Sequence, residues 1–195
     1  MCQELYYGVL EMLKNDGFTF LDFIIVVTIT MILISFSFVR IRKQNNLKNL
    51  NIAKILIYET YKKYAVLALD QRKEYHFNFD FKLHKITVFD GEYKILEEID
   101  TPHSVSINTV YSDVILDKIE SKITINGNIT PIYSIYLFDS KKIAKYRISL
   151  YGFNTLKFLQ INIYKNINDK KPTENGIINF HNTFNPESSK LWEKE

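Results

Sequence analysis

One carboxylate lies in an apolar stretch where its charge calls for an explanation. Asp22 is the only charged residue between Phe18 and Val39. A carboxylate in a lipid-embedded helix costs a few kcal/mol and is usually paired with a cation, and the stretch itself supplies none. Cutting the chain after Gly17 would create one, because the new α-amine of Phe18 could meet Asp22 of a neighbouring copy. The chemistry indicated here is peptide cleavage followed by ion pairing.

The stretch around Asp22 is long enough to cross a membrane. Residues 18–39 contain no Gly or Pro, and 22 helical residues span about 33 Å, roughly the thickness of a bilayer hydrocarbon core. Residues 40–74 are polar but keep a helical period, which predicts an amphipathic helix. Its apolar stripe consists of Leu50, Ala53, Ile57, Tyr61, Tyr64 and Ala68. We expect one helix from Phe18 to about Asp70; the alternative is two helices with a kink near Gln44–Asn46.

The chain changes from helical to strand periodicity at Tyr75. Aromatic residues at 75, 77, 79 and 81 alternate with polar ones, as in a half-buried strand. Asp90-Gly91 and Asn126-Gly127 each predict a two-residue hairpin turn, and Asp139-Ser140 predicts another turn. Residues 75–165 are therefore expected to form a mainly antiparallel β-sheet head covered by the amphipathic helix, an α+β fold. Residues 166–195 read as a polar loop or loosely attached tail, with a possible edge strand at Ile177, Ile178 and Phe180.

The segment Gly17-Phe18-Thr19-Phe20-Leu21-Asp22, followed by an uncharged run, resembles the prepilin signature of type IV pilins and pseudopilins. The resemblance implies that residues 1–17 are a leader and that prepilin peptidase cleaves between Gly17 and Phe18. It also implies N-methylation of Phe18 and a role for Asp22 in filament assembly. The implied partners are prepilin peptidase, other pilin or pseudopilin subunits, the inner-membrane assembly platform and the membrane. The implied location is the cytoplasmic membrane, with a single span, the head outside the cytoplasm and assembly into a filament.

A second resemblance concerns the head. Two predicted strands joined by a polar turn are followed by Leu150-Tyr151-Gly152. This arrangement is similar to the heads of minor pseudopilins of the GspH/FimT kind, including minor pilins of competence systems. The family implies a structural subunit of a pilus, a type II secretion pseudopilus or a competence pseudopilus. Translation could begin at Met1 or at Met12, and Met12 would give a leader of typical length.

No catalytic, metal or cofactor site is expected. His76, His84, His103 and His181 do not have metal-ligand spacing, and no phosphate-binding glycine loop occurs. The chain is therefore expected not to be an enzyme. DNA is a weaker alternative partner of the head, because the net charge is only +3. The basic residues that would contact it read equally well as a solvated edge-strand face: Lys141, Lys142, Lys145 and Arg147.

The charges on either side of the apolar run conflict with this orientation. Residues 1–17 carry one base and three acids, whereas Arg40, Arg42 and Lys43 follow the run, so charge alone places the head in the cytoplasm. Two other interpretations remain open at this stage. One is an uncut, single-span, signal-anchored protein with an extracytoplasmic β-sheet binding domain. The other is a soluble secreted protein cut after Ser37, which the acidic leader and the bases beyond the run argue against.

Overall fold

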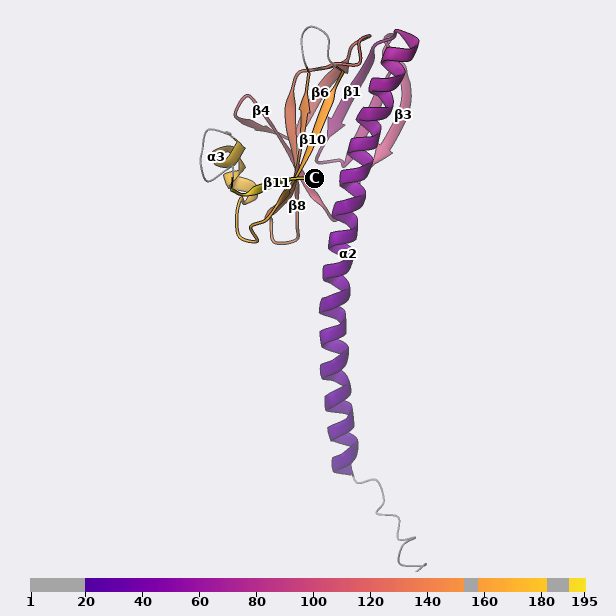
Figure 1. Cartoon of the computed structure of the whole chain (residues 1–195). Helices are drawn as coiled ribbons and strands as arrows, with labels where there is room; N and C mark the ends of the chain where they lie inside the picture. The colour runs from indigo at the N-terminus through magenta and orange to yellow at the C-terminus, as the bar shows by residue number, and fades with distance from the viewer. Residues whose placement is uncertain (1–19, 153–157, 182–189) are drawn as a thin grey trace, which may run out of the picture. The chain divides into compact units, whose positions relative to one another are not determined.

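The computed structural model describes residues 20–152, 158–181 and 190–195, and over these residues the chain has an α+β fold. The long helix α2 (Phe20–Gln71) comes first, and two antiparallel β-sheets follow it (Figure 1). The first sheet has the order β3 (Ile95–Asp100), β2 (Lys85–Phe89), β1 (Tyr75–Asp80), β6 (Lys118–Ile123), β7 (Ile129–Thr130). The second has the order β11 (Trp192–Lys194), β10 (Gln160–Asn166), β9 (Ala144–Tyr151), β8 (Tyr133–Phe138), β4 (Ser106–Tyr111), β5 (Val114–Leu116). The sequence had indicated a single sheet, so the division into two is a finding of the structure.

The chain divides into two compact units, residues 1–44 and residues 45–195. The apolar part of α2 belongs to the first unit, and its amphipathic part belongs to the second, together with both sheets. The backbone is helical throughout Gln44–Asn46, so the alternative of two separate helices is not what the structure contains.

The predicted stripe on the second part of α2 is confirmed. Ile57 and Tyr61 are fully buried, as are the other members of the stripe except Tyr64, which is 4% exposed. Ile55, on another face of the same helix, is 56% exposed. The stripe packs into one core with apolar residues from both sheets, so burial of this face holds the helix on the head.

The predicted strands are largely confirmed, but both two-residue turns differ. At Asn126-Gly127 the Thr124 N–H donates a hydrogen bond of 2.8 Å to the carbonyl of Asn128, which leaves three residues in the loop. The aromatic residues of β1 are buried and their polar neighbours are half-buried. The hairpin of β2 and β3 forms around Asp90, whose Oδ1 accepts hydrogen bonds from the backbone N–H groups of Glu92 and Lys94 at 3.0 and 2.9 Å. The loop is therefore longer than a two-residue turn, and the left-handed backbone falls on Tyr93 (φ 63°) rather than on Gly91.

The second sheet is buried on both faces. All six residues of β8 are buried, which a strand with one solvated face would not show. Ile135 and Leu137 join the core that includes α2, whereas Tyr136 and Phe138 pack on the opposite face with Ile177 of α3 (Ile177–His181). Figure 1 shows α2 and α3 on opposite sides of β8 and β10.

The C-terminal region accounts for this second buried face and corrects the sequence interpretation. Ile177 is fully buried and begins helix α3, which follows the short helix η1 (Glu174–Gly176), so the edge strand expected at Ile177–Phe180 is wrong. The edge strand is instead β11, paired with β10. Glu195 also forms an ion pair with Lys54 of α2. The described residues beyond Lys165 are thus packed on the head and do not form a loosely attached tail.

Candidate functional site

The predicted cleavage and assembly site lies at the beginning of α2. Gly17 and Phe18 fall outside the described residues. Asp22 lies in the first turn of α2, where a carboxylate is favoured by the helix dipole. Asp22 therefore lies in the described part of the apolar helix, whereas cleavage, methylation and ion pairing remain predictions.

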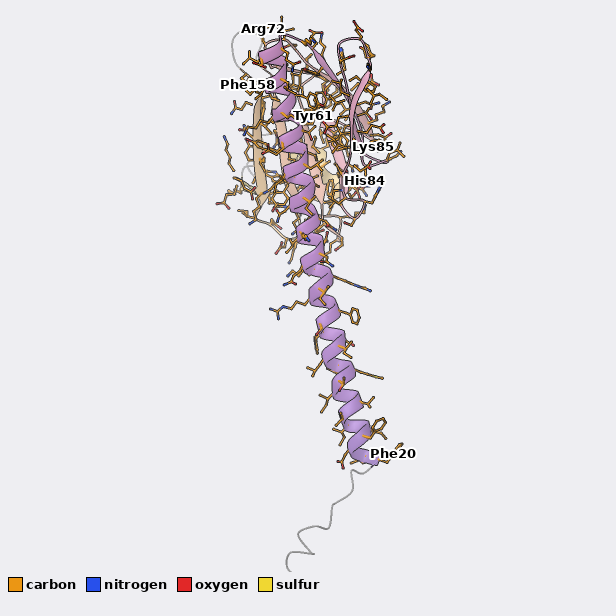
Figure 2. All side chains as sticks on the ribbon, turned by 90° about the vertical axis from the view of Figure 1, so that its right-hand side faces the viewer. Phe20, Tyr61, Arg72, His84, Lys85 and Phe158 are labelled. Atoms are coloured by element: carbon orange, nitrogen blue, oxygen red, sulfur yellow. The ribbon has the colours of Figure 1, made fainter. Side chains whose placement is uncertain are left out.

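The apolar part of α2 exposes its large side chains. Phe20 is 78% exposed and Phe36 is 72% exposed, and side chains project from several sides of the ribbon (Figure 2). An exposed apolar surface of this kind is suited to an apolar environment such as lipid. Among the described residues, α2 is the one helix long and apolar enough to cross a membrane, a test of length and composition alone.

The hydroxyl groups of this segment are suited to lipid. Thr28, Thr30, Ser35 and Ser37 each donate a hydrogen bond to the backbone carbonyl four residues earlier, at 2.7–2.9 Å. A hydroxyl without a partner is costly in hydrocarbon, and this bond supplies the partner within the same helix. These four polar residues are therefore compatible with a membrane-spanning segment.

The basic cluster near the β8–β9 turn is not a solvated edge face. β9 lies inside the second sheet, between β8 and β10. Arg147 is only 6% exposed, and Lys145 forms ion pairs with Asp139 and Asp169 at 3.7 and 2.6 Å. Lys142 pairs with Glu174 at 3.0 Å. Lys142 and Lys145 are thus paired with acidic side chains of the head, and Arg147 is buried, so these three cations do not form a solvated basic face.

The structure adds a cavity that the sequence did not indicate. It has a volume of about 240 Å³ and lies on the second face of the second sheet, lined by Ser134, Arg147, Tyr151 and His181 among others. Tyr136 and His181 are joined by a hydrogen bond of 2.9 Å between the tyrosine hydroxyl and Nδ1. Burial, followed by the charge of Arg147, lowers the pKa of His181 to about 4, so its ring is neutral at pH 7.

The remaining histidines are placed differently. His84 and His103 have ring centroids 4.9 Å apart, and burial, with the neighbouring His103, lowers the pKa of His84. His76 stacks on Tyr93 at 4.4 Å. Within the residues that the structure describes, no group of three or more His, Cys, Asp or Glu could hold a metal ion.

Comparison with protein-family models, with curated proteins and with solved structures finds no match for this chain. What the chain itself supports is a long apolar N-terminal helix on a β-sheet head, with one candidate membrane-spanning segment.

Proposed function

We propose that this chain is a structural subunit, a minor pilin or pseudopilin, of a filament of the type IV pilus, type II secretion or competence class. The observation that supports the proposal is that the Gly17–Asp22 motif of the sequence leads into the long helix α2 (Phe20–Gln71). Asp22 lies in the first turn of a helix whose apolar part exposes nearly all of its side chains and whose second part packs on an α+β head. In this proposal the membrane stores the subunit, and the exposed apolar segment later packs against the same segment of neighbouring subunits.

The division of α2 into two chemically different parts supports this function. Among the described residues, the part of α2 that belongs to the core of the head begins at Leu50. The composition of the apolar segment therefore reflects an interaction with lipid or with other chains. A membrane anchor alone would satisfy this requirement as well, so processing at Gly17 decides between the two functions.

The decisive test is the N-terminus of the native protein. The protein is isolated from the membrane fraction of cells with an active prepilin peptidase, and its intact mass and N-terminal sequence are determined. The expected result is a chain that starts at N-methylated Phe18. A chain that retains residues 12–17 or 1–17 would overturn the proposal and support a signal-anchored protein, and a chain that starts at Phe38 would support secretion.

A matched variant makes the result specific. Gly17→Leu adds a side chain at the residue before the proposed cleavage site and leaves the rest of the chain unchanged. We expect the variant to keep its leader and to stay in the membrane. If Gly17→Leu and the natural chain yield the same mature N-terminus, cleavage does not depend on the motif and the proposal is wrong.

A further inference from the structure

The strongest feature outside the apolar helix is a buried arginine that lines a cavity. Arg147 lies on the face of β9 away from α2, and its neighbours across the sheet are Tyr136 on β8 and Tyr164 on β10. Its guanidinium carbon is 6.0 and 5.6 Å from the centroids of these two rings. The rings stabilise a cation but do not neutralise it.

The guanidinium is held in place by a short polar network. Its Nε donates a hydrogen bond of 3.0 Å to Ser149 Oγ, and the hydroxyls of Ser149 and Ser134 share one of 2.8 Å. Among the residues that the structure describes, no carboxylate lies within 4.0 Å of Arg147, and the bond from Nε is the one hydrogen bond that its side chain donates. Within the described residues, the two terminal nitrogens have no hydrogen-bond partner, and they can serve a group in the cavity.

A buried charge of this kind is costly unless an opposite charge accompanies it. Removing a guanidinium from water carries a large desolvation cost, and a fixed orientation in a cavity is typical of ligand-binding arginines. The terminal nitrogens of a guanidinium form a planar fork that matches the two oxygens of a carboxylate. We propose that the cavity beside Arg147 binds a carboxylate group, with Arg147 as its counter-ion and Ser134 as a hydroxyl partner.

The charge count of the cavity favours a monoanion. Arg147 supplies one positive charge, and the adjacent His181 is neutral at pH 7. The negative charge of Asp113 acts on His181 in the direction that raises its pKa, and an acidic neighbour disfavours a multiply charged ligand such as phosphate more than a monoanion. Tyr151, two strand positions beyond Ser149 on the same face, lines the cavity and suits an apolar or aromatic body attached to the carboxylate.

The carboxylate has two sources: a free small organic acid, or a carboxylate carried by another polypeptide. The proposal does not depend on filament assembly, and detergent-solubilised full-length protein is used to test it. The probes are sodium benzoate and the tripeptide Gly-Gly-Phe with a free C-terminus, with benzamide and the amidated tripeptide as uncharged controls. Binding of benzoate as well as peptide indicates a site open to small acids, and binding of the peptide alone indicates a polypeptide carboxylate.

Variants of two cations make the test specific. Arg147→Met keeps much of the side-chain volume and removes the charge, whereas Lys141→Met makes the same change of charge at an exposed turn residue outside the cavity lining. In titration calorimetry we expect the natural chain and Lys141→Met to bind a carboxylate probe equally, and Arg147→Met to bind it at least tenfold more weakly. Equal binding by Arg147→Met, or equal binding of the uncharged controls, would overturn the proposal.

A measurement on the unmodified chain keeps the proposal testable if Arg147→Met does not fold. The chain has four arginines, Arg40, Arg42, Arg72 and Arg147, and their Nε–H resonances can be followed in a ¹⁵N-labelled sample. We expect saturable movement of the resonance of Arg147 alone on addition of the carboxylate. The absence of any saturable shift with both carboxylate probes, up to tens of millimolar, would refute the site.

Discussion

The hydroxyl oxygens of Tyr61 and Tyr133 lie 2.6 Å apart in the buried interface between α2 and β8. Tyr61 is fully buried and stacks on Phe77, while Tyr133 also shares a hydrogen bond of 3.2 Å with Ser121 of β6. Burial raises the pKa of Tyr61 to about 12 and raises that of Tyr133 well above its usual range, so both stay protonated. This pair fixes the helix to strands from both sheets.

The pair predicts unequal effects of two conservative substitutions. Tyr133→Phe removes the shared partner of Tyr61 and Ser121 and should lower the free energy of unfolding by about 2–3 kcal/mol. Tyr61→Phe leaves Tyr133 bonded to Ser121 and should cost about 1 kcal/mol. Denaturant unfolding of the two variants and of the double variant measures this, and the double variant should cost less than the sum. A larger loss for Tyr61→Phe would contradict the network.

Two isoleucines of α2 test which face holds the head. Ile57→Ala opens a hole in the core and should lower the free energy of unfolding by about 2–5 kcal/mol. Ile55→Ala makes the same change where the side chain is 56% exposed, and it should change stability by less than about 0.5 kcal/mol. Thermal unfolding of the solubilised variants measures both, and similar losses would mean that α2 packs on the head through a different face.

Two glycines provide a second matched pair. A Cβ added to Gly152 would collide with the backbone carbonyl oxygen of Ile129, whereas a Cβ on Gly91 would find its nearest atom at 3.9 Å. Gly152→Ala should therefore cost about 1–3 kcal/mol of stability, and Gly91→Ala should lie within about 0.5 kcal/mol of the natural chain. Denaturation midpoints of the two variants check this, and a tolerated Gly152→Ala would show that β7 and the end of β9 are not in contact.

His181 predicts a dependence of stability on pH. Its pKa is about 4 in the folded chain but about 6.5 when unfolded, so the unfolded chain binds more protons between these values. The stabilising contribution is complete above pH 6.5 and is lost as the pH falls towards 4. His181→Gln should lose less stability than the natural chain between pH 7 and pH 5, with Arg147 and Asp113 unchanged as neighbours. Parallel pH profiles of unfolding for the two chains would contradict the assignment.

Asp22 tests filament assembly separately from cleavage. If its carboxylate pairs with the α-amine of Phe18 on a neighbouring subunit, Asp22→Ala should leave cleavage intact and lower incorporation into filaments severalfold. Asp22→Glu keeps the charge and supplies the residue typical of the resembled family, so it should retain incorporation. The amount of each variant in sheared filaments is measured against the membrane pool. Full incorporation of Asp22→Ala would count against the pairing.

The parts of the fold that the sequence predicted depend on local periodicity. The stripe from Leu50 to Ala68 and the alternation from Tyr75 onward each report which residues face the core, and both were confirmed. The apolar helix itself was predictable for the same reason, because it depends on composition along a continuous segment.

The cavity could not be predicted, because it depends on residues far apart in the chain. A charged residue in an alternating strand usually marks the solvent face, and Arg147 was interpreted in that way. Its burial follows from the position of α3, whose Ile177 is thirty residues further along and covers the same face of the sheet. The residues next to Arg147 in the sequence contain no pattern that indicates that a distant helix packs over this face of the sheet.

The two-sided burial of β8 also sets an order of events during synthesis. Its second face is covered by Ile177 and by the partly buried Trp192. One face of β8 therefore stays unpacked during synthesis until Ile177 and Trp192 have emerged from the ribosome. The apolar helix, by contrast, leaves the exit tunnel before any strand exists. Its insertion into a bilayer can therefore precede folding of the head, whose native packing needs Ile177 and Trp192.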